Sequence, residues 1–303
     1  MANFLLVFIC IIIGFLLQNV KQIPRNTHQS LNYYVLYVAL PSLALYAIPK
    51  ISFTWNLALP ISIAWIGFGL SFLFFYALGS YFNWSKKLIG CLILTSGLSN
   101  TSFVGFPIIE ALYGAEGMNI AILIDQAGSF VVVTTLAVFV ATKFTNKTIK
   151  TGEMLVKILK FPPFIAFTFA LILALLELDF PKIVQIAFHK IGSTVSVVAL
   201  VAVGFQLKFE KRSKHWSFLI LGLAFKLLLL PGFFYFLYKI ILNKNGIIID
   251  VSILEMAMAP MITGAIIASN FGLKPKLSNM MVGFGIPISF LTVAIWYYIL
   301  TNF

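Results

Sequence analysis

Charged side chains are scarce in this chain. Asp, Glu, Lys and Arg make up 10% of its 303 residues, whereas a soluble domain carries about 25%. Apolar residues make up 61% and recur in long runs, and no polar stretch is long enough for a large soluble domain. The composition therefore excludes a soluble protein and predicts one that lies in a membrane.

Cysteine is nearly absent as well. Only Cys10 and Cys91 occur, both inside apolar runs, which excludes a disulfide framework. The 3 histidines have no metal-ligand spacing. The sequence also lacks a glycine-rich phosphate loop ending in Lys-Ser/Thr and a plausible Ser-His-Asp set. We therefore predict that the chain is not an enzyme and binds no metal centre or organic cofactor.

The apolar runs predict an all-α membrane protein with ten spanning helices, because most reach the roughly 20 residues needed to cross the hydrocarbon. No Lys or Arg precedes the first run and no small-residue cleavage site follows it, so it is interpreted as a retained helix. The predicted spans lie near 3–20, 31–49, 56–79, 88–113, 118–142, 161–178, 183–207, 216–242, 248–269 and 278–301.

The net charge of +12 is unevenly distributed. The odd-numbered loops hold roughly threefold more Lys and Arg than the even-numbered loops, which places them in the cytoplasm by the positive-inside rule. We therefore predict a multi-pass protein of the cell (inner) membrane with both termini outside. The basic residues are assigned to topology and to anionic lipid heads, and nucleic acid is not an expected partner.

A basic stretch near the midpoint, 143–160, divides the spans into two groups of five. Because five is odd, the second group must be inserted upside down relative to the first. The sequence therefore predicts two inverted five-helix repeats, 1–142 and 161–303, joined by a cytoplasmic linker. This arrangement is common among secondary transporters.

The fourth and ninth spans are interrupted, at 100–107 and 256–264. In the first, Asn100 can cap a new helix, Gly105 relieves the backbone and Pro107 fits the first turn of the helix that follows. In the second interruption, Pro260 lies at the start of the helix that follows, as Pro107 does in the first. Lipid does not tolerate unpaired backbone groups, so such breaks must be buried in protein or line a cavity.

Half-helices that begin at these breaks point their amino ends into the membrane. Each end carries a partial positive charge of about half a unit and unpaired N–H groups, so two of them predict a dry site for a carboxylate. The alternative is two kinked helices capped by their own side chains. The predicted substrate-binding residues are Asn100, Thr101, Ser102, Gly105, Pro107, Pro260, Thr263 and Gly264.

Ionisable residues deep in a membrane usually face the bundle interior and have a use. Asp125 lies near the middle of its span and is the first candidate for ion or proton coupling, with Glu255 and Lys226 as further candidates. Alternatively, Asp125 is a structural acceptor for a broken-helix amino end or a partner of Lys226. Glu110 is expected at the outer water interface.

These residues resemble a known family. The run Ser99–Pro107 (SNTSFVGFP), closed by Ala111–Gly114, resembles the fourth helix of the auxin efflux carriers, which include plant PIN exporters and bacterial carriers of malonate-type acids. Asn32–Pro41 (NYYVLYVALP) resembles the second helix, and Lys226 followed by Pro231 is also similar. Because the long cytoplasmic loop of the plant exporters is missing, the chain resembles the short bacterial members.

The resemblance implies the ten-helix inverted-repeat fold of bile acid–sodium symporters and sodium–proton antiporters, with helices 4 and 9 crossing at the substrate site. It also implies a scaffold of helices 1, 2, 6 and 7 that often dimerises, and an elevator-like transport unit of helices 3–5 and 8–10. We expect a homodimeric secondary transporter of a small organic anion, linked to protons or sodium. The alternatives are a sodium–proton antiporter, although no Asp-Asp pair is present, a channel, or a membrane sensor or receptor.

Overall fold

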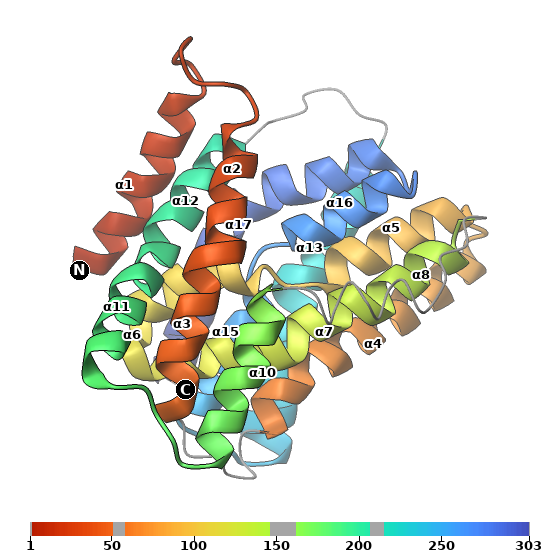
Figure 1. The fold of residues 1–303 in the computed structure, drawn as a ribbon. Coiled ribbons are helices and arrows are strands. Elements are labelled where there is room, and N and C mark those ends of the chain that lie inside the picture. Colours follow the sequence, from red (N-terminus) through yellow and green to blue (C-terminus); the bar gives the residue numbers. More distant parts are fainter. Residues whose placement is uncertain (1, 51–57, 146–161, 207–214, 303) are drawn as a thin grey trace. The chain divides into compact units, whose positions relative to one another are not determined.

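The computed structural model describes residues 2–50, 58–145, 162–206 and 215–302. Within these ranges the chain is helical and no strand occurs, apart from one isolated backbone bridge between Ser99 and Pro260 (Figure 1). The all-α prediction is confirmed for this part of the chain, because apolar runs satisfy their own backbone hydrogen bonds as helices. Most of the predicted linker, 143–160, lies outside the described residues.

Among the residues that the structure describes, six helical stretches are long and apolar enough to cross a membrane. Two further apolar helices, Leu6–Leu17 and Pro162–Leu175, are shorter. The structure therefore supports a membrane-embedded helical protein, and the ten-helix inverted repeat stays a prediction. The long stretches are Thr27–Lys50, Ala58–Tyr81, Thr101–Lys143, Lys182–Gln206, Trp216–Ile241 and Pro275–Asn302.

The helices form two compact units. The first unit draws on three separate parts of the sequence, within 1–57, 102–122 and 155–207. Its helices are α1 (Ala2–Leu17), α2 (Thr27–Tyr34), α3 (Leu40–Ala47), almost all of α6 (Phe106–Leu123), α10 (Pro162–Leu175), α11 (Lys182–Gly192) and α12 (Thr194–Gln206).

Glycine sets the packing of α1 against α12 in this unit (Figure 1). A Cβ atom at Gly14 would lie 2.1 Å from the carbonyl oxygen of Val201, and one at Gly204 would lie 2.2 Å from that of Ile11. Neither position has room for a side chain. Small residues of this kind let membrane helices approach closely. The van der Waals contacts that result stabilise helix packing in lipid, where the hydrophobic effect does not drive helices together.

The second unit draws on 58–101, 123–154 and 208–303. Here α4 packs against both α5 and α15, and α16 packs against α5 and α17. Its helices are α4 (Ala58–Tyr81), α5 (Lys86–Gly97), α7 (Phe130–Val132), α8 (Val138–Lys143), α13 (Trp216–Ala224), α14 (Leu230–Tyr235), α15 (Ile247–Ala257), α16 (Ile262–Asn270) and α17 (Pro275–Asn302).

Wider π-helical turns join several of these helices, and they occur in both units. Two of them, η1 (Val35–Ala39) and η7 (Phe225–Leu229), are each followed by a proline two residues after their last residue, Pro41 and Pro231. Pro231 has no N–H to donate to the carbonyl of Leu227 four residues earlier. The indole Nε1 of Trp296 on α17 donates to that carbonyl instead, at 2.9 Å. A side chain from another helix thus satisfies the group that the proline leaves open.

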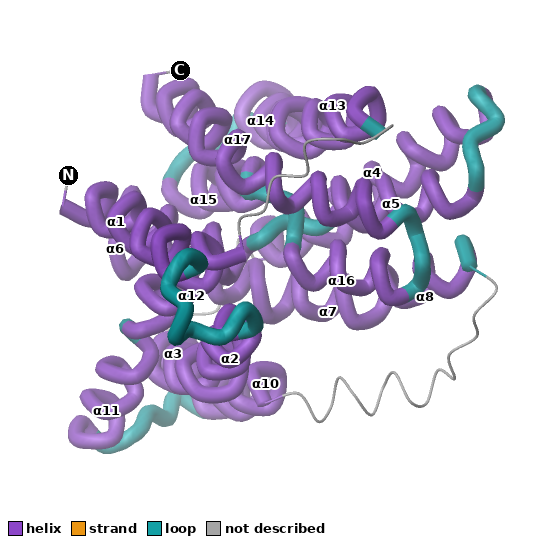
Figure 2. Tube along the Cα trace, turned by 90° about the horizontal axis from the view of Figure 1, so that it is seen from above, coloured by secondary structure: helices purple, strands orange, loops and turns teal. Residues whose placement is uncertain are grey.

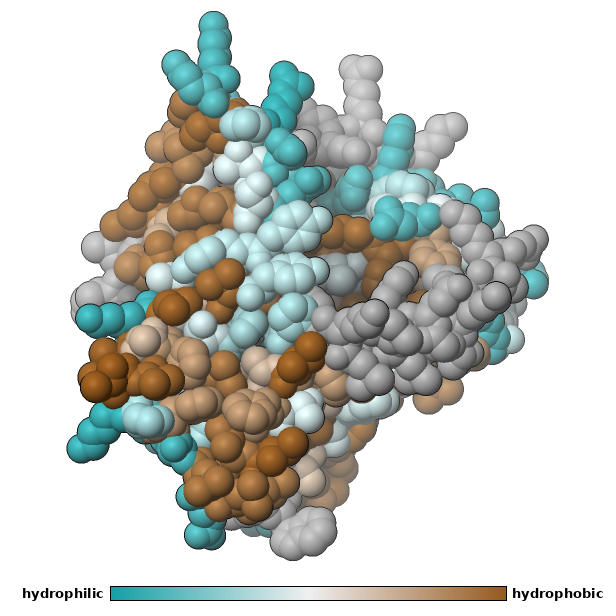
Figure 3. All heavy atoms as spheres, in the orientation of Figure 1, coloured by the Kyte–Doolittle hydropathy of each residue, from teal (hydrophilic) through white to brown (hydrophobic). Residues whose placement is uncertain are grey.

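Apolar side chains cover much of the outer surface. Figure 3 shows them gathered over α1, whereas paler, more polar side chains lie over α2. On α1 the exposed residues include Phe8, Ile12 and Leu16, at 52%, 55% and 57% of their full surface. An exposed apolar face of this kind suits contact with lipid.

Candidate functional site

Two non-helical segments of the second unit face one another. The helix α5 ends at Gly97, and the chain is extended at Leu98 before it winds again as the π-turn η4 (Thr101–Gly105). In the other segment α15 ends at Ala257 and α16 begins at Ile262. Both predicted interruptions are therefore confirmed, and both appear as loop among the helices in Figure 2.

The structure corrects where the first half-helix starts. We expected its amino end at Pro107, but helical winding resumes at Thr101 and continues into α6. Pro107 is therefore the second residue of α6 and lies inside a helical stretch that runs from Thr101 to a kink at Gly114, where the backbone is not helical (φ 62°, ψ −151°). The break is shorter than the sequence suggests because the side chains that could cap a helix, from Asn100 on, already lie at its start.

The two segments satisfy each other's backbone. The N–H of Asn100 donates to the carbonyl of Ala259 at 2.8 Å, and the N–H of Met261 donates to that of Leu98 at 3.0 Å. These bonds form the antiparallel bridge between Ser99 and Pro260. Buried backbone groups need partners, so pairing lets two helices break side by side inside the protein.

Asp125 is tied to the first break. It lies in the π-turn η5 (Ile124–Ser129) and is 4% exposed. Its carboxylate accepts a hydrogen bond from the hydroxyl of Thr101 at 2.5 Å and another from the amide of Gln126 at 2.7 Å. These contacts place the carboxylate against the amino end of the helix after the break, and the coupling role of Asp125 stays a prediction.

Lys226 reaches both breaks from η7 and is fully buried. Its ammonium donates to the hydroxyl of Ser99 and, at 3.0 Å, to the carbonyl of Met256 in the last turn of α15. A buried ammonium has three donors and no acceptor, so it requires oxygen partners of this kind. The side chain joins the two broken helices.

Glu255 is the third buried ionisable group. Its side chain is 0% exposed, and neither carboxyl oxygen has a hydrogen-bond partner among the described residues. It lies within electrostatic range of Asp125 and Lys226. An ionised carboxylate held in this way costs several kcal/mol, so the group needs a proton or a nearby positive charge.

The structure brings together some of the predicted substrate-binding residues and not others. Asn100 and Thr101 are buried at the pairing, whereas Thr263 is exposed. A Cβ at Gly264 would lie 2.7 Å from the side chain of Leu98 and 3.2 Å from the carbonyl of Leu94, so this glycine lets α16 approach α5. Ser102, Gly105 and Pro107 follow along the chain in the first unit.

Sequence reasoning missed three contributors to this site: the hydroxyl of Ser99, the amide of Gln126 and the carbonyl of Met256. Two of them had a visible signal, because Ser99 comes directly before the break and Gln126 directly follows Asp125. The backbone carbonyl had none, since any residue type supplies one.

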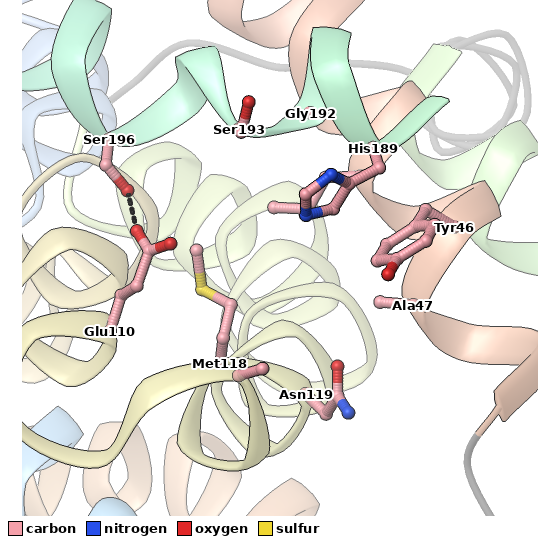
Figure 4. Close-up of a pocket in the computed structure, with 11 residues that line it drawn as sticks. Tyr46, Ala47, Glu110, Met118, Asn119, His189, Gly192, Ser193 and Ser196 are labelled. Carbon is pink, nitrogen blue, oxygen red and sulfur yellow. Dashed lines mark hydrogen bonds between the residues drawn. The ribbon is translucent and has the colours of Figure 1, made fainter. Parts of the chain in front are cut away.

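Glu110 lies in the first unit and lines a cavity of about 60 Å³. Its carboxylate accepts a hydrogen bond from the hydroxyl of Ser196 at 2.5 Å, and His189 and Tyr46 contribute rings to the same cavity, with centroids 4.7 Å apart (Figure 4). Glu110 is half-buried. Its expected place at the outer water interface stays a prediction, and the structure gives it a specific hydroxyl partner, Ser196.

Comparisons with known proteins give the family. The chain is 26% identical to an uncharacterized transporter of Methanocaldococcus jannaschii, over 98% of each chain. It is 23% identical to an uncharacterized transporter of Methanothermobacter thermautotrophicus, over 96% of this chain and 95% of that one. Residues 1–297 match the family described as membrane transport protein. The chain belongs to this family of transporters, which includes the auxin efflux carriers that its broken fourth helix resembles.

Proposed function

We propose that this membrane transporter is a secondary carrier, not an enzyme, and that it moves a small organic anion by elevator-type alternating access. The observation that carries the proposal is the pair of helix breaks, hydrogen-bonded to each other around buried ionisable side chains. A chain that needed only to span the membrane would gain nothing from two interrupted helices and a buried lysine.

The charge of the site supports an anion as the substrate. The amino end of α16 carries a partial positive charge and lies next to the break, and the ammonium of Lys226 lies at the same pairing. Together they favour a carboxylate. In this proposal Asn100, Thr101 and Pro260 bind the substrate with Thr263 and Gly264, whereas Ser102, Gly105 and Pro107 stay predictions.

Asp125 and Glu255 supply the coupling in this proposal. A carrier moves a substrate against its gradient only when a second ligand also binds its inward and outward states differently. Buried carboxylates beside the substrate site fit this role, because they gain or lose a proton or a cation as the site opens and closes. We also propose a homodimer in the cell (inner) membrane, as the resemblance implies.

A binding screen on the purified protein tests the proposal. Thermal unfolding is followed with a series of small mono- and dicarboxylates, because a ligand that binds only the folded protein raises its midpoint. We expect at least one carboxylate to stabilise the protein and to show counterflow in proteoliposomes. Asp125→Asn should abolish the counterflow, whereas Asp179→Asn, the same change at an exposed residue, should leave it intact.

Two results would contradict the proposal. No stabilisation by any carboxylate, together with sodium–proton exchange in the same vesicles, would favour the antiporter that lacks an organic substrate. A flux that neither saturates nor shows counterflow would indicate a channel.

A further inference from the structure

Sodium is one of the two coupling ions that the sequence leaves open. In transporters with broken helices, sodium is held by backbone carbonyls at the carboxyl ends of half-helices and by oxygens of the unwound segments. In this chain that place is defined by the end of α15 and by the segment Leu98–Asn100 paired with it. Whether sodium fits there depends on what these oxygens already bind.

The oxygens at this place already bind a cation that belongs to the protein. The ammonium of Lys226 donates to the carbonyl of Met256 in the last turn of α15 and to the hydroxyl of Ser99 in the facing segment. The carboxylate of Glu255 is within electrostatic range. Carbonyl and hydroxyl oxygens are among the ligands that hard cations prefer, so the ammonium binds two oxygens of the kind that would otherwise suit a metal ion.

We propose that Lys226 is a built-in cation that takes the place of sodium in this chain. The ammonium is covalently fixed to η7 and fully buried, so it cannot leave with the substrate. A sodium ion beside it would meet a like charge in a dry environment and would compete with the ammonium for the hydroxyl of Ser99 and the carbonyl of Met256. Of the two coupling ions considered, only the proton then has a site, on the buried carboxylates.

The inference rests on the proposed carrier function, but it can be tested without knowing the substrate. The purified protein is unfolded by heat in sodium, potassium or choline chloride at equal ionic strength. We expect the unmodified chain to have the same midpoint in all three salts. Lys226→Ala removes the ammonium and leaves its oxygens with space for an ion, so sodium should raise the midpoint of this variant by about 2 °C or more over choline.

The matched control is Lys239→Ala. Lys239 lies in the same unit and forms an ion pair with Asp250 at 2.8 Å, with 11% of its side chain exposed, so its loss should produce no sodium response. A sodium-specific rise in the unmodified chain would overturn the inference, and this measurement does not require any variant to fold. A folded Lys226→Ala that is indifferent to sodium would also overturn it.

The outcome separates this inference from the proposed function. Carboxylate transport that requires sodium would overturn the role of Lys226 and leave the organic-anion carrier standing. A chain that ignores both sodium and every carboxylate would overturn the carrier and leave the lysine as a fixed internal charge.

Discussion

At the scale of single residues, the hydroxyl of Thr101 holds the site together. It is the first residue after the break, is fully buried, and donates to Asp125 at 2.5 Å. Thr101→Val keeps the shape of the side chain and removes the donor. We expect a lower unfolding midpoint, equivalent to about 1–3 kcal/mol, because a buried carboxylate oxygen loses a partner.

Thermal unfolding of three variants checks this prediction. Thr101→Ser keeps a hydroxyl and should restore most of the stability. Thr142→Val removes a hydroxyl that bonds only within its own helix turn, to the carbonyl of Phe139 at 2.8 Å, and should cost much less. Equal losses in Thr101→Val and Thr142→Val would show that the contact with Asp125 has no special weight.

The sequence alone singled out the three buried charges of the candidate site but not all of their hydrogen-bond partners. Asp125, Lys226 and Glu255 stood out because a charge is rare in an apolar run, and all three are buried around the breaks. The pairing of Lys226 with Ser99 and with the carbonyl of Met256 could not be predicted, since these residues lie 127 and 30 positions away in the sequence and neither supplies a carboxylate. Contacts of this range depend on how the helices pack, which hydropathy does not encode.

At the scale of helices, a proline and a tryptophan on different elements form one unit. Pro231 cannot donate to the carbonyl of Leu227, and Trp296 donates to it from α17. Trp296→Phe should therefore lower the unfolding midpoint by the equivalent of about 1–3 kcal/mol, because it leaves a buried carbonyl without this partner. Pro231→Ala supplies a backbone N–H in the same place.

A double-mutant cycle tests whether the two residues act together. If they do, Trp296→Phe should cost clearly less in the Pro231→Ala background than in the unmodified chain, as measured by thermal unfolding. Additive losses would mean that Trp296 stabilises the protein through ring packing alone, for example against Tyr235, whose ring centroid lies 6.1 Å away.

Helix positions followed from hydropathy more faithfully than helix interruptions did. The apolar run expected near 56–79 appears as α4 (Ala58–Tyr81), since length and apolarity suffice to place a helix. The start of the half-helix was misplaced at Pro107, because proline fits the first turn but is also tolerated in membrane helices. The close approach of α1 and α12 at Gly14 and Gly204 could not be predicted, because the sequence does not show whether a glycine in a helix serves close packing or backbone flexibility.

At the scale of the whole molecule, the distribution of Lys and Arg among the loops predicts the orientation of the chain in the membrane. Lys86 and Lys87 follow the third predicted span, so the loop before α5 is expected in the cytoplasm. The loop before α15 is expected outside. With Cys10 and Cys91 replaced by alanine, single cysteines at Ser85 and Asn245, both exposed, report on these two loops.

A membrane-impermeant maleimide applied to intact cells reads out the topology. We expect it to label Asn245→Cys at once and Ser85→Cys only after the cells are lysed. The opposite pattern would turn the whole chain over and place both termini in the cytoplasm. Labelling of both sites in intact cells would mean that the membrane is crossed an even number of times between them, which the five spans predicted from α5 to α14 do not allow.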